Sequence, residues 1–167
     1  MEDRYLADFA WSCRESIPSI PGLEVWRTLD GQLARAYAHE PVANWAKLIC
    51  LRDLRGASAG QQADFHYVVE TDVRRENEQD FNAWYELEHL PGLASVPGTV
   101  RARRFIREVG APRYLACYDL TTQESLTHPS WLAVRHTDWS SRIRPTFRDP
   151  VRMMFVRVSR PDDKLTY

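Results

Sequence analysis

The sequence predicts an α+β fold in which helices cover an antiparallel sheet. Three observations support this prediction. Runs of β-branched and aromatic residues alternate with stretches of helical spacing, and Pro, Gly or polar turn residues mark each change of pattern. The resulting order between Phe65 and Val158 is strand, helix, strand, strand, helix, strand, or βαββαβ. A chain of 167 residues buries roughly 70% of the surface that its unfolded form exposes, which suits one domain with its own core.

The first strand and helix of this order lie between Phe65 and Pro91. Residues 65–71 are rich in β-branched and aromatic side chains, which favour a strand. A helix is expected from Glu78 to His89. Pro91 is predicted to end it, because the residue before a proline is pushed out of the helical region.

The second half of the order begins with a hairpin. Residues 99–107 and 114–120 are predicted as its antiparallel strands, since glycine and proline lie in the loop between them. A capping-box pattern at residues 121–124 begins the second helical region. Residues 151–158 are the last predicted strand, and a polar tail follows at 159–167.

The N-terminal segment repeats part of this pattern. A helix followed by a Pro-Gly turn is expected at Asp8–Trp11, as at Asp80–Trp84, and an apolar strand ending in Asp-Leu occurs in both halves. We therefore predict a partial αββ repeat or extension at residues 1–62 and the main domain at residues 63–167. The alternative is chance similarity between short pieces.

Composition and charge exclude several classes of partner. The formal net charge is -1, so the chain has no electrostatic reason to bind nucleic acid. It contains no long apolar run that indicates a signal peptide or a membrane span. Cys13, Cys50 and Cys117 lack the spacing of a disulfide framework or a zinc site. We expect a cytoplasmic protein that acts on a small-molecule substrate.

Several motifs resemble those of a known superfamily. In chain order they are Phe81-Asn82-Ala83-Trp84-Tyr85-Glu86-Leu87-Glu88-His89-Leu90-Pro91, Val96-Pro97-Gly98, Arg103-Arg104-Phe105 and Tyr114-Leu115-Ala116-Cys117-Tyr118. Together they resemble the ferredoxin-like, dimeric α/β-barrel superfamily, above all its poorly characterised bacterial branch near the EthD-like proteins. The resemblance covers about residues 65–158, and the N-terminal segment departs from it.

A homodimer is expected from the open sheet face. A four-stranded sheet covered by helices on one side leaves its other side in need of burial, and a two-fold pairing closes it into a barrel. The alternative is that the N-terminal segment covers this face instead.

The resemblance implies a range of reactions, since the superfamily includes cofactor-free cyclases, isomerases, quinol-forming monooxygenases and haem-degrading enzymes. Our main expectation is a cofactor-free isomerase, cyclase or lyase for a small apolar carbonyl or carboxylate metabolite of bacterial catabolism or secondary metabolism. The alternatives are a non-catalytic small-molecule-binding or accessory protein and a cofactor-free quinol-type monooxygenase. The chain has no glycine-rich nucleotide loop and no metal-ligand spacing, so we expect no cofactor and no metal. Haem held by His89 or His128 is a further alternative.

Glu88 and His89 are the first candidate catalytic pair. On a helical wheel that starts at Phe81, Glu88 falls inside the apolar stripe and His89 at its margin. Burial near the C-terminus of a helix raises the pKa of a carboxyl toward the range of a general acid or base. Alternatively, Glu88 turns to water or pairs with an arginine, and His89 caps the helix.

The resemblance adds further acid–base candidates, since cyclase-like relatives use His and Tyr in a pocket between sheet and helices. It nominates His66, Tyr67, His89 and Tyr118 in this sequence. His66 and Tyr67 point to opposite faces of their strand, so only one of them can join a given cavity. The alternative for each is a structural role.

Arg103 is the candidate anchor for a substrate carboxylate, because it lies in the middle of a strand where escape to water is hardest. The alternative is a salt bridge to Glu88, Glu70 or Asp119. The apolar walls of the pocket are expected to come from four aromatic residues, namely Phe81, Trp84, Tyr85 and Trp131.

Overall fold

A computed structural model describes residues 1–158, and the expected polar tail at 159–167 lies outside them. The strands of the described part are β1 (Arg4–Ala10), β2 (Glu24–Thr28), β3 (Leu33–Ala38), β4 (Ala46–Arg55), β5 (Phe65–Val73), β6 (Thr99–Arg107), β7 (Tyr114–Leu120) and β8 (Phe147–Arg157). They form a closed antiparallel barrel in the order β1-β3-β2-β8-β5-β7-β6-β4, with β4 paired to β1. Closure leaves no unpaired sheet edge among these strands.

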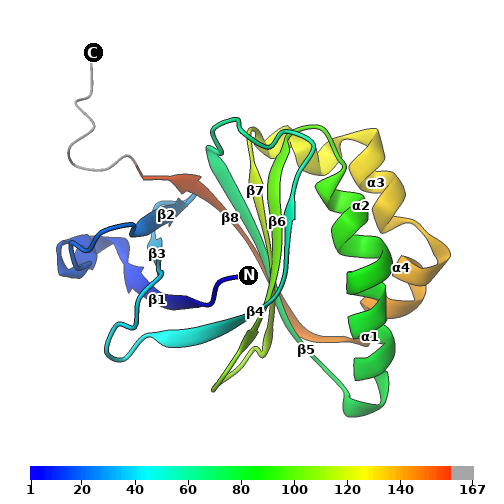
Figure 1. Ribbon diagram of the computed structural model, residues 1–167, viewed down its shortest axis with the longest axis horizontal. Coiled ribbons are helices and arrows are strands. Elements are labelled where there is room, and N and C mark those ends of the chain that lie inside the picture. Colours follow the sequence, from blue (N-terminus) through cyan, green and yellow to red (C-terminus); the bar gives the residue numbers. More distant parts are fainter. Residues whose placement is uncertain (159–167) are drawn as a thin grey trace.

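The helices lie on the outside of the barrel, against β5 to β8 (Figure 1). The first helical region is continuous and consists of α1 (Glu78–Trp84), a π-helical turn η3 (Tyr85–His89) and α2 (Leu90–Ala94). The second contains the 3₁₀ turns η4 (Gln123–Thr127) and η5 (Arg144–Thr146) around α3 (Pro129–Arg135) and α4 (Asp138–Ile143). The βαββαβ order predicted for residues 65–158 is confirmed.

The prediction that Pro91 ends the first helix is wrong. The helix continues to Ala94, because Pro91 lies in the first turn of α2, directly after the π-helical turn. The hydrogen-bond register changes at this point, so the absent N–H of Pro91 does not interrupt the hydrogen bonding of the helix.

The helix expected at Asp8–Trp11 is also wrong. This segment is the end of β1 and the first residue of η1 (Trp11–Ser16), a 3₁₀ helix. β1 pairs with a strand on each side, and Asp8 accepts two hydrogen bonds of 2.7 Å from Arg35 on β3. These non-local pairings outweigh the local helical pattern. The division of the chain after residue 62 stays a prediction.

The N-terminal strands cover the sheet face that the helices leave open. β1 to β4 lie across from the helical layer and complete the barrel within one chain (Figure 1). The open face on which the homodimer prediction rested is therefore buried by the chain itself. The homodimer stays a prediction, and a measurement of mass in solution tests it.

The sheet separates two hydrophobic clusters. One lies between the sheet and the helices and contains Trp84, Tyr118 and Trp131. The other lies inside the barrel and contains Trp26 and Phe155. Because side chains alternate along a strand, neighbouring residues of β5 and β7 belong to different clusters.

Candidate functional site

A cavity lies between the sheet and the helices. A water-sized sphere can occupy about 30 Å³ of it, whereas all the space between the lining atoms, open solvent included, is about 370 Å³. The strands contribute Tyr67 and Tyr118, and the first helical region contributes His89. With Tyr85, which also comes from the first helical region, the cavity brings together one histidine and three tyrosines from three separate parts of the fold.

The π-helical turn decides which helix residue faces this cavity. A π-turn brings residues five apart into register, and the rings of Trp84 and His89 stack with centroids 4.0 Å apart. His89 is consequently buried, whereas Glu88 is half-buried and accepts a 2.6 Å hydrogen bond from Thr137 Oγ1. The helical wheel used for the sequence assumed a regular α-helix, and it therefore placed Glu88 inside the apolar stripe and His89 at its margin. That placement is wrong.

Two polar atoms at the cavity have no partner within residues 1–158. They are Nδ1 of His89 and the hydroxyl oxygen of Tyr118, and both are fully buried. Most buried polar groups in proteins are hydrogen-bonded, so such atoms call for an explanation. A ligand with a hydrogen-bonding group would satisfy them.

The ionisation of these groups follows from their surroundings. Burial, followed by the charges of Arg144 and Arg135, lowers the pKa of His89 to about 3. Burial raises the pKa of the Tyr118 hydroxyl well above its ordinary value. At neutral pH the cavity thus presents a neutral imidazole and a protonated phenol.

Three arginines add positive charge to the same cavity. Arg135 of α3, Arg144 of η5 and Arg152 of β8 line it, and in the described part of the chain none of them forms a salt bridge with a carboxylate. Burial, and then repulsion from Arg135 and Arg152, lowers the pKa of Arg144. Like charges gathered without counter-charges favour an anionic ligand.

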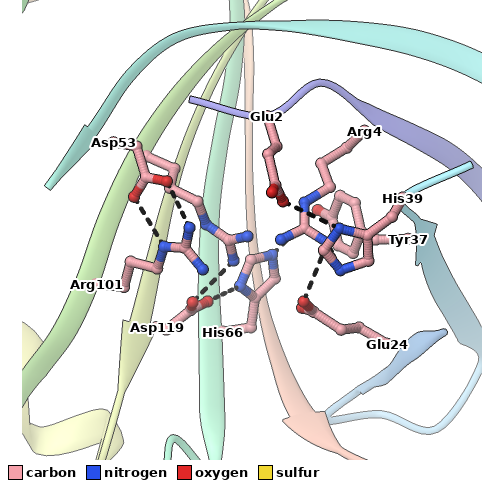
Figure 2. Close-up of polar contacts among 10 residues, drawn as sticks. Glu2, Arg4, Glu24, Tyr37, His39, Asp53, His66, Arg101 and Asp119 are labelled. Carbon is pink, nitrogen blue, oxygen red and sulfur yellow. Dashed lines mark hydrogen bonds and ion pairs between the residues drawn. The ribbon is translucent and has the colours of Figure 1, made fainter. Parts of the chain in front are cut away.

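His66 and Arg103 lie on the other face of the sheet, inside the barrel. Figure 2 shows His66 beside Asp119, where Nδ1 and Oδ1 are 2.7 Å apart. Arg103 Nη2 donates to the second oxygen of Asp119 at 2.8 Å. Arg103 therefore makes one of the salt bridges considered as the alternative to substrate binding, and it does not line the cavity.

The barrel network continues through Tyr37. Burial disfavours a carboxylate, but Arg103 and His66 still hold the pKa of Asp119 below its ordinary value. An ionised Asp119 only accepts, so His66 Nδ1 donates to it and Nε2 accepts from the Tyr37 hydroxyl at 3.0 Å. Burial lowers the pKa of His66, which keeps this imidazole neutral.

Other charges inside the barrel and at its end are also paired. Arg35 donates to Asp8 and Glu70, and Arg107 donates to the second oxygen of Glu70. At the end shown in Figure 2, Arg101 pairs with Asp53, Arg4 with Glu24 and His39 with Glu2. Because these arginines are paired with carboxylates of the chain itself, they have the features of a structural ion-pair network and not of a ligand site.

The cavity unites part of the predicted site. It is lined by six predicted residues, namely Tyr67, Trp84, Tyr85, His89, Tyr118 and Trp131. Phe81 packs in the core against Tyr85 and Tyr114 and does not line it. Sequence reasoning missed Arg135, Arg144 and Arg152, because each arginine by itself has the pattern of an ordinary surface residue.

The described residues contain neither a cluster of metal-ligating side chains nor a membrane-spanning helix. Within residues 1–158, no three His, Cys, Asp or Glu side chains gather in a way that could hold a metal ion. No helix in the same part of the chain is long and apolar enough to cross a membrane.

The fold of this chain is similar to those of several solved structures, although the sequences have little in common. No protein-family model and no curated protein matches the sequence. A staphylococcal structure named as a major regulator of pathogenesis matches with a TM-score of 0.67 at 7% identity, over 95% of this chain and 100% of that one. The fold is ferredoxin-like.

Two Listeria monocytogenes structures are similar to a comparable degree. A haem-degrading enzyme matches with a TM-score of 0.65 at 8% identity, over 93% of this chain and 99% of that one. An uncharacterised ferredoxin-fold protein related to antibiotic biosynthesis monooxygenases matches with a TM-score of 0.66 at 9% identity, over 96% of each chain. The EthD-like branch is not singled out by these structures.

The comparison corrects our main expectation for the reaction. We expected an isomerase, cyclase or lyase, whereas the neighbours named for a reaction are called monooxygenase-related or haem-degrading. These names are those of oxidative reactions. The quinol-type monooxygenase, an alternative from the sequence, fits them better.

Proposed function

We propose that this chain is a cofactor-independent monooxygenase for a small quinol that carries a carboxylate. The observation that carries the proposal is the cavity between sheet and helices. There Nδ1 of His89 and the hydroxyl of Tyr118 lie buried, and neither they nor the nearby arginines find a partner or counter-charge within residues 1–158. The monooxygenase-related neighbour supports the class of reaction.

The size of the hollow limits the substrate. The space inside it that a water-sized sphere can occupy is about 30 Å³, well below the roughly 300–1,000 Å³ typical of small-molecule sites. A one- or two-ring quinol therefore enters only after the half-buried Arg135 and Arg144 side chains swing outward and widen the cavity. Haem is larger than such a quinol, and Nδ1 of His89, the candidate ligand atom, lies at a cavity of only about 30 Å³.

The residues act on the protons and charge of the quinol. Arg144 and Arg135 bind the carboxylate and stabilise the phenolate that forms when the quinol loses a proton. The bound anion offsets both arginines and so raises the pKa of His89, whose Nδ1 then takes this proton. The Tyr118 hydroxyl donates a hydrogen bond to the substrate oxygen.

The phenolate is the electron source for molecular oxygen. The quinol gives up four electrons, two on becoming a quinone and two as one ring C–H becomes C–OH. Oxygen accepts these four electrons, and one of its atoms enters the ring. The other atom leaves as water with the two quinol protons, so the reaction needs no external reductant.

Oxygen uptake with 1,4-dihydroxy-2-naphthoate tests the proposal. We expect uptake above the uncatalysed rate, with one atom of ¹⁸O₂ retained in the product, and a much lower rate with 1,4-dihydroxynaphthalene, which lacks the carboxylate. Tyr118→Phe and His89→Gln are expected to lower the rate at least tenfold. His136→Gln, an exposed histidine outside the cavity, is the matched control.

The opposite results are equally specific. Binding of the naphthoate without oxygen uptake would contradict a monooxygenase and favour the non-catalytic binding protein. Equal rates for both quinols would contradict the role of the arginines.

A further inference from the structure

A second hollow lies beside the first helical region, over β4, β6 and β7. Its volume is about 430 Å³, and it shares no lining residue with the cavity described above. Its walls are largely apolar and come from Leu51, Ala83, Ile106 and Tyr114, with Asn82, Glu86 and Arg104 as the polar members. The volume falls in the range of small-molecule sites.

Arg104 sets this hollow apart. Among residues 1–158 four arginines are buried, with 2–4% exposure. Three of them have carboxylate partners, namely Arg4 with Glu24, Arg35 with Asp8 and Glu70, and Arg103 with Asp119. Arg104 is 4% exposed and has no salt bridge to any carboxylate within residues 1–158. Burying a guanidinium without a counter-charge destabilises a fold. A ligand carboxylate from outside the chain would supply the counter-charge that Arg104 lacks.

The guanidinium of Arg104 is held in place but not neutralised. Its Nη2 donates to the Asn82 side-chain oxygen at 2.6 Å, and its Nε has no partner. The group lies over the rings of Tyr85, Phe81 and Tyr114, at 4.4, 4.9 and 5.0 Å from their centroids. This packing orients the fork while its charge stays open to a ligand.

The one carboxylate that lines the hollow does not act as a counter-charge for Arg104. Glu86 lines the hollow, but it pairs with Arg52 at 3.2 Å and lies at the exposed rim. A carboxylate ligand would therefore meet one buried positive charge beneath apolar walls.

We propose that this hollow is a second small-molecule site, which binds a carboxylate with a flat apolar body. The carboxylate pairs with Arg104, and the body lies between Leu51, Ile106 and the Tyr114 ring. A planar guanidinium that approaches a carboxylate with two nitrogens favours this class of ligand over a neutral one. The inference does not depend on the monooxygenase proposal.

Methyl NMR titration with 2-naphthoate tests the second site. Signals of Leu51 and Ile106 report on this hollow, whereas those of Leu93 report on the first cavity, which it lines. We expect the Leu51 and Ile106 signals to shift with 2-naphthoate at concentrations at least tenfold lower than with the neutral 2-naphthalenemethanol. Equal response to the two probes, or movement of Leu93 alone, would overturn the proposal.

A charge at the rim tests the site without disturbing the packing of Arg104. Leu51→Glu is expected to weaken binding at least tenfold, as judged by the Ile106 signals. Leu87→Glu makes the same change at a residue that is 71% exposed and does not line the hollow, and it should leave binding unchanged. Unchanged affinity in Leu51→Glu would contradict the site. The proposal would also be contradicted if the wild-type protein were a dimer and Leu51→Glu made it monomeric, because the hollow would then be the contact surface for a second copy of the chain.

Discussion

The two faces of the sheet hold similar residues in opposite electrostatic states. Inside the barrel, His66 and Arg103 share Asp119, and Tyr37 donates to the imidazole. On the helix side, His89 and Tyr118 keep unpartnered polar atoms, and the nearby arginines lack carboxylates among the described residues. Single unpartnered atoms occur on both faces, since Trp26 Nε1 and Arg103 Nε inside the barrel also lack a partner within residues 1–158. The comparison teaches that residue type does not mark a candidate site, whereas arginines without counter-charges do.

Removing a partner inside the barrel should have the largest effect on stability. Asp119→Asn leaves Arg103 buried without a counter-charge, and we expect it to lower the free energy of unfolding by about 3–5 kcal/mol in urea denaturation. Asp53→Asn breaks the more exposed pair with Arg101 and should cost about 1 kcal/mol or less. A loss in Asp119→Asn as small as in this control would contradict a paired barrel network.

The pH dependence of stability should reveal the buried neutral His89. Its pKa of about 3 lies below the ordinary 6.5, so the unfolded chain takes up this proton first. The stabilisation is complete above pH 6.5 and is lost as the pH falls toward 3. Between pH 7 and 5 we expect a loss of about 2 kcal/mol. Urea denaturation at both pH values should show this loss in wild type together with that of the buried His66, whose pKa is also lowered, and His89→Phe should remove only the part due to His89.

A matched histidine is the control for that result. His136→Phe alters an exposed residue and should keep the wild-type dependence on pH. If His89→Phe keeps the same dependence, His89 is not a buried neutral group in solution.

Removing one unpaired arginine should affect binding and not stability. Arg144→Gln is expected to raise the KM for the carboxylated quinol about tenfold, because one charge-assisted hydrogen bond is lost. The free energy of unfolding should stay equal or rise, since Arg135 and Arg152 repel Arg144. Steady-state oxygen uptake and urea denaturation measure the two effects. Arg142→Gln, which alters a surface arginine paired with Asp80, should change neither.

The smallest expected effect is the difference in unfolding free energy between removing the Tyr37 hydroxyl and removing the Tyr118 hydroxyl. Tyr37→Phe removes the hydrogen bond to His66 and should cost about 1 kcal/mol of unfolding free energy. Tyr118→Phe removes a buried hydroxyl without a partner and should cost nothing measurable by the same urea denaturation. Equal losses would mean that Tyr118 has a partner in solution.

The predicted cavity lining came partly from local pattern and partly from the resemblance to a known superfamily. Helical spacing indicated Trp84 and Tyr85 in one helix and Trp131 in another, whereas the resemblance nominated Tyr67 and Tyr118. The helical wheel placed His89 only at the margin of the apolar stripe, because a π-helical turn cannot be foreseen from regular spacing. The separation of His66 from Tyr67 also follows from strand alternation, but the face that meets the helices does not. Arg135, Arg144 and Arg152 come together only when α3, η5 and β8 pack, so no sequence spacing indicated them.

The sequence by itself determined the βαββαβ order, because periodicity and turn residues act over a few neighbouring positions. Only the tertiary structure decided that the first strands close the barrel, since strand pairing between distant segments overrides local helix preference at Asp8–Trp11. It also decided the π-helical turn that moves His89 inward and Glu88 outward. Above all it decided which buried charges find partners, because ion pairs such as Arg103 with Asp119 join residues from different strands.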